Sequence, residues 1–557
     1  MQRTLGRQER GRDGPTNGAE HRSETHSELD ALIVGAGFAG VYLLHRLRQE
    51  GFKVQIAEAG TGLGGIWHWN SYPGARVDSQ YPVYALGIPE VYNTWAWSQM
   101  YPGEKELKRY FQHVDKVLNI SKDVLYEHKV IAAGFDPSID KWRIQIENGV
   151  RISTRWFIPC LGFAAKRYFP DWPGVDNYKG YVCHSSFWPS EGVDMRGKRV
   201  AVIGTGATGI QIAQEAAKEA DHLTCFIRTP NTCVPMNQGP VDPEQAKKDL
   251  EALHGQLSAT RYDNHAGFLY AAPTKGVLDD PPDIREAVLE EAWQLGGFRI
   301  LFSYNNILTS QEANDELYKF WVKKRRAQIT NPQKRDILAP ETPPHPFGGR
   351  RLSLEQDYYV QMDKDHVTLV NVKQNDIARF VENGIVTEDG VLHELDIIAL
   401  ATGFDSVTGG LKDLGVTGLN GELLTEKWRM GTYTYLGMTV ANFPNFLFAY
   451  GPQSPTAYAN GPTIVEKQDE WIVAVLKKMR DLGKTRLNAN EDAEQAWKET
   501  IRSLHSLSLR DKVEGWYMGT NIPGKPREAL NYAGGVPLYI KTILGALEDD
   551  LRGFTVT

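Results

Sequence analysis

The sequence predicts an α/β protein with two strand–helix–strand domains, the second of which is interrupted by a helical insertion. Two observations predict the domains: an apolar strand runs into a glycine-rich turn and a helix near residue 35, and the same pattern returns near residue 204. A third predicts the insertion, because residues 239–334 show helical spacing of apolar side chains between Pro- and Gly-rich turns. A chain of 557 residues is also too long for one hydrophobic core.

The first glycine-rich turn follows the apolar run DALIV and places Gly35, Gly37 and Gly40 in the pattern Gly-x-Gly-x-x-Gly. In a Rossmann-like domain the first glycine makes a tight turn, the second lets a pyrophosphate approach the backbone, and the third lets the helix pack on the strand. The next strand ends at Glu58, where a carboxylate is suited to accept hydrogen bonds from ribose hydroxyls. Together these features predict a bound adenine dinucleotide.

The second glycine-rich turn contains Gly204, Gly206 and Gly209, but its following strand ends at Arg228 and Thr229 instead of an acid. A guanidinium pairs with a phosphate through two hydrogen bonds, whereas a carboxylate repels it. By charge, the first domain suits FAD and the second suits NADPH with its 2′-phosphate. This is the plan of flavoproteins with two dinucleotide sites. The alternative for Arg228 is a solvated side chain at a strand end.

The order of the motifs predicts an FAD-binding domain that is split by the NADPH-binding domain. The apolar run ELDIIAL before Ala401, Thr402 and Gly403 is interpreted as the point where the chain returns to the FAD-binding domain. The predicted boundaries are 1–29 for a disordered polar tail, 30–165 and 396–557 for the two parts of the FAD-binding domain, 166–238 and 335–395 for the two parts of the NADPH-binding domain, and 239–334 for the helical insertion.

Composition and charge exclude several classes of function. The net charge of −7 lacks the basic footprint of a nucleic-acid-binding protein, and no apolar run is long enough for a membrane span. The four cysteines are widely spaced, which predicts no zinc site, no other metal site and no redox-active pair. The polar N-terminus has no apolar signal segment. We therefore expect a cytoplasmic protein, and no protein partner is implied.

The segment YKGYVCHSSFWP, residues 178–189, closely resembles the fingerprint of type I Baeyer–Villiger monooxygenases, which belong to the class B flavoprotein monooxygenases. The matching positions are Tyr178, Gly180, His184, Trp188 and Pro189. The first position is usually Phe in the family, and Tyr keeps the ring while adding a hydroxyl. The resemblance extends over nearly the whole chain after the tail and includes the stretches GLGGIWHWNSYPGARVD, RRLSLEQDYY and ATGFD.

The resemblance implies a role for the fingerprint histidine and a reaction for the protein. His184 would couple rotation of the two domains to the position of the cofactors, and a packed core histidine is the alternative. The reaction would be NADPH- and FAD-dependent oxidation of ketones, above all cyclic ones, to esters or lactones. It would proceed with dioxygen through a flavin peroxide and a Criegee intermediate.

Both of these intermediates are negatively charged, and a fixed arginine stabilises such charge because it stays protonated. The match to the family assigns this role to Arg351, held in place by Asp78, and places Arg350 near the NADPH 2′-phosphate. Two adjacent arginines after Gly-Gly would otherwise suggest an exposed loop.

The predicted cofactor sites comprise further residues of the two turns and of the aromatic stretch after the first one. The FAD site is predicted to contain Gly35, Gly37, Phe38, Ala39, Gly40, Glu58, Gly65, Trp67, Trp69, Tyr72 and Asp78. The NADPH site is predicted to contain Gly204, Thr205, Gly206, Ala207, Thr208, Gly209, Arg228, Thr229, Arg350 and Arg351. The three large aromatic residues of the first set are interpreted as walls of the flavin site, with a generic aromatic core as the alternative.

Two other functions are weighed against the main hypothesis. A related flavin monooxygenase that oxidises amine nitrogen or sulfide sulfur has less need of Arg351. A non-enzymatic dinucleotide sensor is disfavoured by the presence of Asp78, Arg351 and both intact glycine turns. The loop 451–461 and the insertion are expected to form the substrate walls, but their side chains do not define a particular ketone.

Overall fold

The computed structural model describes residues 26–255 and 258–557, so residues 1–25 of the predicted tail lie outside the described residues. The first strand, β1 (His26–Val34), begins earlier than expected. It pairs in parallel with β6 (Arg151–Pro159) along its whole length. The predicted domain start at residue 30 is therefore four residues late, because residues 26–29, three of them polar, gain backbone partners in the sheet.

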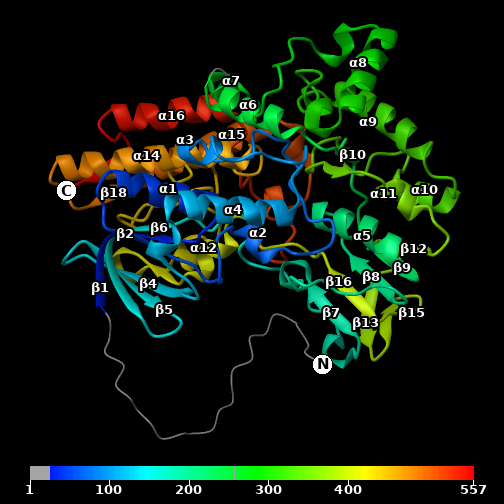
Figure 1. Cartoon of the computed structure of the whole chain (residues 1–557), viewed down its shortest axis with the longest axis horizontal. Helices are drawn as coiled ribbons and strands as arrows, with labels where there is room; N and C mark the ends of the chain where they lie inside the picture. Colours follow the sequence, from blue (N-terminus) through cyan, green and yellow to red (C-terminus); the bar gives the residue numbers. More distant parts are fainter. Residues whose placement is uncertain (1–25, 256–257) are drawn as a thin grey trace, which may run out of the picture.

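The first sheet has seven strands and carries the first glycine turn at the end of β1. Its order is β17–β4–β5–β6–β1–β2–β3, with bounds Val416–Thr417, Val130–Asp136, Lys141–Ile146, Arg151–Pro159, His26–Val34, Val54–Ala57 and Val124–Leu125. The helices α1 (Phe38–Gln49) and α14 (Gly461–Asp481) lie together on this sheet, with α16 (Val536–Glu548) beside them (Figure 1). The C-terminal part of the chain thus completes the domain that the N-terminal part begins.

The second sheet has five parallel strands and carries the second glycine turn. Its order is β12–β9–β8–β16–β7, with bounds Val367–Asn371, His222–Ile227, Arg199–Ile203, Ile397–Leu400 and Tyr181–His184. Strand β16 pairs with both β8 and β7, so the predicted domain boundary at residue 396 is wrong. All four residues of β16 are buried, as an interior strand of a parallel sheet requires, and the chain returns to the first domain only after it.

The insertion is helical, as the apolar spacing predicts. Its helices are α6 (Pro243–His254), α7 (Ser258–Asp263), α8 (Pro282–Leu295), α9 (Gln311–Arg326) and α10 (Pro332–Leu338). Figure 1 shows α6 and α7 near α16 of the first domain, and α8 to α10 on the side of the second domain. A buried ion pair of 2.8 Å joins Arg261 on α7 to Glu466 on α14, whereas Trp321 on α9 donates to the carbonyl of Cys233. The insertion therefore spans both domains.

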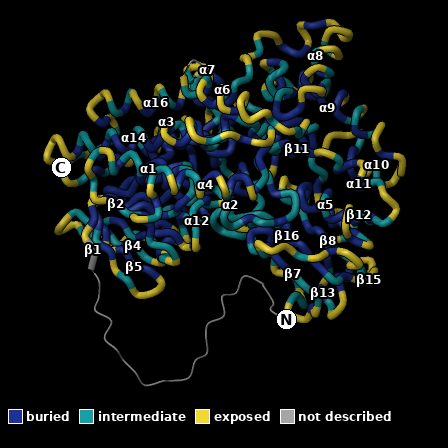
Figure 2. The backbone as a smooth tube through the Cα atoms, in the orientation of Figure 1, coloured by how far each residue is buried: buried dark blue, intermediate teal, exposed yellow. Residues whose placement is uncertain are grey.

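Buried residues form separate hydrophobic clusters at the two sheets, and Figure 2 marks the buried parts of the chain in dark blue. The first core joins β1 to α1, α14 and α16, and the second joins β8 and β9 to α5 (Ala207–Glu219) and the insertion. The cysteines at 160, 183, 225 and 233 are all buried and form no disulfide. Within the described ranges, no helix combines the length and the hydropathy that crossing a membrane would require.

Candidate active site

One large cavity of about 1670 Å³ runs between the two sheets and is lined by both glycine turns. The cavity brings together most of the residues predicted for the two cofactor sites. Those that line it are Gly35, Gly37, Phe38, Ala39, Glu58, Gly65, Trp67, Trp69, Tyr72, Asp78, Gly204, Thr205, Gly206, Ala207, Thr208, Arg228, Thr229, Arg350 and Arg351. Of the residues predicted for the cofactor sites, Gly40 and Gly209 do not line it. The five fingerprint residues, which are predicted to couple the domains, also lie outside its lining: Tyr178, Gly180, His184, Trp188 and Pro189.

The first glycine turn has the geometry of a backbone cradle. Gly35 has a φ of +101°, which favours glycine, and a Cβ at Gly40 would lie 1.9 Å from the Gly35 carbonyl oxygen. Gly40 therefore serves the contact between helix and strand and does not reach the cavity. A Cβ at Gly37 would lie 3.5 Å from the Cα of Gly65, so the two backbones approach closely at the cavity wall. This cradle fits a pyrophosphate at the N-terminus of α1.

Glu58 lies at the end of β2 and is almost fully buried. Its carboxylate oxygens accept hydrogen bonds from the backbone N–H groups of Ala36 and Gly60, both at 2.7 Å. Burial raises the pKa of Glu58, and these backbone donors oppose that rise. Each carboxylate oxygen can accept more than one hydrogen bond, so Glu58 is both held by the glycine turn and suited to ribose hydroxyls.

The second glycine turn repeats this geometry with one difference. Gly204 has a φ of +114°, and a Cβ at Gly209 would lie 2.1 Å from the Gly204 carbonyl oxygen. A Cβ at Gly206 would meet no atom of the described residues within 4 Å. Gly206 thus faces the open cavity at the N-terminus of α5, where backbone N–H groups are available to an anion.

Two arginines from distant parts of the chain lie near each other at the second turn. Arg228 follows β9 and is exposed, while Arg350 donates from Nε to the carbonyl oxygen of Glu514 at 3.0 Å. Burial lowers the pKa of Arg350, and the nearby positive charge of Arg228 lowers it further. Two like charges at one end of a cavity are stabilised by an anion such as a phosphate. The neighbouring Thr229 carbonyl accepts a hydrogen bond from the Thr205 hydroxyl at 2.6 Å, which joins the strand end to the turn.

Arg351 is held by two separate acceptors. Its Nε and Nη2 donate to the two carboxylate oxygens of Asp78 at 2.7 and 2.9 Å, and Nη1 donates to the carbonyl oxygen of Ala457 at 2.9 Å. Burial lowers the pKa of Arg351, but the charge and hydrogen bonds of Asp78 outweigh burial and raise it above its ordinary value. Its side chain keeps 31% exposure toward the cavity. The guanidinium is therefore a fixed, permanent cation.

His184 ends β7 and is fully buried. Its Nε2 lies 3.0 Å from the carbonyl oxygen of Gly403, and its Nδ1 lies 2.9 Å from the hydroxyl of Ser186. Burial lowers its pKa to about 4, so the imidazole is neutral near pH 7. A carbonyl only accepts, which places the proton on Nε2 and leaves Nδ1 as an acceptor. His184 thus joins the fingerprint to the segment that follows β16.

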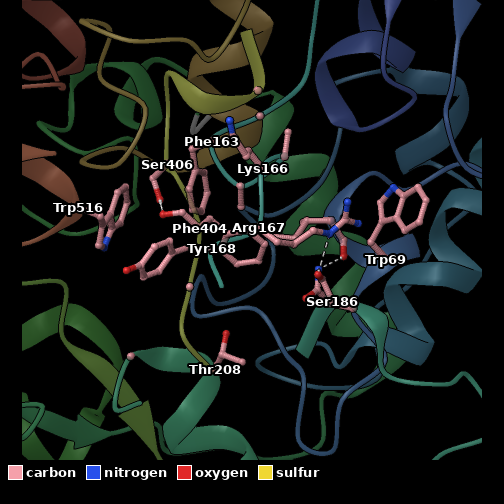
Figure 3. A pocket seen from close by; sticks show the side chains of 18 of the residues that line it. Trp69, Phe163, Lys166, Arg167, Tyr168, Ser186, Thr208, Phe404, Ser406 and Trp516 are labelled. Carbon is pink, nitrogen blue, oxygen red and sulfur yellow. Dashed lines mark hydrogen bonds between the residues drawn. The ribbon is translucent and has the colours of Figure 1, made fainter. Parts of the chain in front are cut away.

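Arg167, which no sequence motif singles out, connects this histidine to the cavity. Its Nε donates to the Ser186 hydroxyl at 3.0 Å, and its guanidinium lies 5.0 Å from the ring centre of Trp69 and 4.4 Å from that of Phe187. Figure 3 shows Arg167 extended between Ser186 and Trp69 at the cavity wall. Burial lowers the pKa of Arg167. The available sequence feature was its place in the segment that connects the two domains.

Two further predicted aromatic residues have distinct surroundings. Trp67 donates from its indole nitrogen to the hydroxyl of Tyr84 at 3.0 Å, next to the first glycine turn. Tyr72 donates to the side chain of Gln211 on α5 at 3.0 Å, so it connects the two domains. Both line the cavity together with Trp69.

The other fingerprint residues shape the second domain. The Tyr178 hydroxyl donates to the carbonyl oxygen of Leu395 at 3.0 Å. The Phe that is usual at this position has no hydroxyl, and in this chain the additional hydroxyl has a hydrogen-bond partner. A Cβ at Gly180 would lie 2.2 Å from that hydroxyl, so glycine is required for the ring to fold back. Trp188 is buried in the second core. These three residues lie outside the lining of the cavity and pack within the second domain.

Comparisons with known proteins agree with this geometry. Residues 29–250 match the family model described as pyridine nucleotide-disulphide oxidoreductase, although the four cysteines are unpaired. The chain is 43% identical to the FAD-binding monooxygenase acrE of Aspergillus aculeatus, over 94% of this chain and 88% of that protein. It is 40% identical to a cyclopentanone 1,2-monooxygenase of Comamonas sp., over 96% and 97% of the two chains.

A further relative is named Baeyer–Villiger monooxygenase. Among solved structures, one described as OTEMO in complex with FAD and NADP superimposes with a TM-score of 0.90 at 32% identity. That alignment covers 95% of this chain and 99% of the other.

Proposed function

The chain belongs to the Baeyer–Villiger monooxygenase family, and on that premise we propose that it uses FAD, NADPH and dioxygen to convert ketones, above all cyclic ones, to esters or lactones. The observation that carries the proposal is the Arg351–Asp78 pair, which faces a cavity shared by two dinucleotide cradles. Such a cation is needed where negative charge develops on oxygen.

The two cradles divide the cofactors by charge. The first turn, with Glu58 at its strand end, would hold FAD through its pyrophosphate and ribose. The second turn, with Arg228 and Arg350, would hold NADPH and pair with its 2′-phosphate. When bound, FAD supplies the transfer of electrons and the activation of dioxygen.

Arg351 would stabilise the negative charge that forms on oxygen when a ketone carbonyl is attacked. It is suited to this role because Asp78 holds the guanidinium at two nitrogens and keeps it protonated. The fixed geometry means that little reorganisation is needed during the reaction. We propose that Asp78 acts through Arg351 as a positioning residue.

His184 would act as a structural link and not in proton transfer. It is buried outside the cavity, and its contact with Gly403 fastens the second domain to the returning chain. The contacts of Ser186 and Arg167 extend this link to Trp69 at the cavity wall. We propose that this connected set couples the domain arrangement to the cofactors.

The experiment that tests the function identifies products. The purified holoenzyme is incubated with NADPH, isotope-labelled dioxygen and a panel of linear, monocyclic and fused-ring ketones, with an amine and a sulfide as additional substrates. We expect labelled ester or lactone from a ketone, in proportion to NADPH consumed. Labelled N-oxide or sulfoxide without any ester would establish the alternative flavin monooxygenase. Failure of NADPH to bleach the bound flavin would support a non-enzymatic sensor.

A further inference from the structure

A chain of three side chains leads from the neighbourhood of Arg351 to the protein surface. The Tyr458 hydroxyl lies 3.2 Å from Nε2 of His505, and Nδ1 of His505 lies 3.3 Å from a carboxylate oxygen of Asp511. His505 is fully buried near the end of α15 (Glu491–Ser506), whereas the Asp511 side chain is 47% exposed. None of these residues has a role in the function proposed above.

The chemistry of the three groups fixes the direction of the hydrogen bonds. A carboxylate only accepts, so Nδ1 of His505 donates to Asp511 and Nε2 accepts from the Tyr458 hydroxyl. Burial lowers the pKa of His505, which agrees with a neutral imidazole. In this arrangement Asp511 orients the His505 imidazole, and the imidazole orients the Tyr458 hydroxyl.

Tyr458 is also restrained through its ring. The guanidinium of Arg510 lies 4.4 Å from the ring centre, and the ring of Tyr517 meets it edge-on with centres 4.8 Å apart. Cation–π contacts and edge-on aromatic contacts both stabilise the position of a ring. With the bond to His505, they restrain Tyr458 at both its hydroxyl and its ring.

The residue immediately before Tyr458 contacts the proposed active site. The Ala457 carbonyl oxygen accepts the hydrogen bond from Nη1 of Arg351 at 2.9 Å, and the Ala457 amide donates to Asn531 at 3.1 Å. Asp78 holds the Nε and Nη2 edge of the guanidinium but makes no bond to Nη1. The angle of the guanidinium therefore depends on where the Ala457 carbonyl lies.

We propose that Tyr458, His505 and Asp511 are positioning residues that hold the Ala457 carbonyl against Arg351 and so set the angle of its guanidinium. This inference rests on the proposed function, because it assigns the three residues to the reaction that Arg351 serves. A displacement of about 1 Å at a positioned charge lowers the rate of the step that it stabilises. We expect the reduction of the flavin by NADPH to depend much less on the exact angle of Arg351, because no negative charge on oxygen develops in that step.

The test uses the holoenzyme and four variants, namely Tyr458→Phe, His505→Leu, the double variant and His505→Gln. Gln retains an acceptor and a donor and is the conservative replacement. Tyr435→Phe is the matched control, because Tyr435 is buried and its hydroxyl donates to the carbonyl oxygen of Arg552 at 2.7 Å. Flavin reduction, ester formed per NADPH consumed, and hydrogen exchange of residues 456–460 are measured for each.

We expect Tyr458→Phe and His505→Leu each to lower the rate of ester formation about fivefold to tenfold, with unchanged flavin reduction and more hydrogen peroxide released. The double variant should lose no more than either single variant, because one hydrogen-bonded chain is broken once. His505→Gln should recover most of the loss. Exchange at residues 456–460 should rise in the damaging variants but not in the control.

Additive losses in the double variant, or equal losses in reduction and oxygenation, would overturn the proposal. So would unchanged exchange at residues 456–460, since the loop would then not depend on the chain of hydrogen bonds. If the wild-type protein makes no ester from any ketone, the proposed function fails separately. Exchange would still report whether the three residues hold the Ala457 carbonyl.

Discussion

The Nε2 atom of His184 and the carbonyl oxygen of Gly403 lie 3.0 Å apart, although 219 residues separate them in the chain. The same carbonyl accepts a hydrogen bond from the backbone N–H of Tyr168, also at 3.0 Å. Tyr168 belongs to the first segment that connects the domains, and Gly403 to the second. One carbonyl oxygen therefore joins the two connections and the fingerprint histidine.

The burial of the His184 imidazole makes the free energy of unfolding depend on pH. His184 has a pKa of about 4 in the folded protein against an ordinary value of 6.5, so the unfolded chain binds a proton first as the pH falls. We expect the free energy of unfolding of the wild type to fall relative to His184→Gln by about 1.4 kcal/mol per pH unit between those values. Urea unfolding at pH 7.5, 6 and 5 measures it. A constant difference at all three would contradict this account.

Loss of the cation at Arg351 should separate the two halves of the reaction. In Arg351→Ala, NADPH should still reduce the flavin, but ester formation should fall by about 10²–10³, the usual cost of removing a fixed electrostatic group. Asp78→Asn keeps an oxygen acceptor but removes the charge, and its loss should be smaller. Rapid-mixing spectroscopy follows reduction, and gas chromatography measures ester. Near-normal ester from Arg351→Ala would rule out the assigned role.

Replacement of Arg228 tests the selection of the reduced cofactor. Arg228→Ala should raise the KM for NADPH about 10-fold to 100-fold, because a charge-assisted contact to the 2′-phosphate is lost, and should leave the KM for NADH nearly unchanged. Arg196→Ala is the control, since that arginine is exposed and pairs only with the nearby Asp194 among the described residues. Steady-state kinetics with both cofactors provides the measurement. Equal weakening of NADPH and NADH would argue against a phosphate contact.

Replacement by alanine should affect NADPH binding at one glycine of the second turn and stability at another. Gly206→Ala should fold with an unchanged melting temperature but bind NADPH weakly, because its added Cβ enters the cavity without meeting a described atom within 4 Å. Gly209→Ala should be strongly destabilised, because its Cβ would lie 2.1 Å from a backbone oxygen. Thermal unfolding and NADPH titration of both variants distinguish these effects. Similar melting temperatures would show that the turn adapts more than this geometry indicates.

Much of the architecture follows from local sequence patterns. The glycine spacing at both turns requires a tight turn and close helix packing, and Gly40 and Gly209 meet that requirement sterically. The boundary predicted at residue 396 places the strand 397–400 in the wrong domain, because an apolar run indicates burial but not which sheet provides the neighbours. The predicted start at residue 30 is late because residues 26–29 are mostly polar and join the strand through pairing with β6.

The site residues that occupy a position of the family motif could be predicted from the sequence. Backbone groups that contribute to the site could not. Arg351 and Asp78 were expected together, and the structure brings them into contact. The Ala457 carbonyl that also holds Arg351 carries no side-chain signature. Arg167 has no fixed motif position, and its contacts with Trp69 and Ser186 exist only in three dimensions. Their assigned roles stay predictions until the variants are made.

The two connecting segments are hydrogen-bonded to each other, with the Thr402 hydroxyl 2.6 Å from the Tyr168 carbonyl oxygen. Residues 169–401 thus form a cassette whose ends already touch, and a homologous cassette from a relative could be grafted between these two points. Such a chimera would not exchange coenzyme preference alone. Arg351 lies inside the cassette and Asp78 outside it, so every graft would also rebuild the ion pair between donor and recipient.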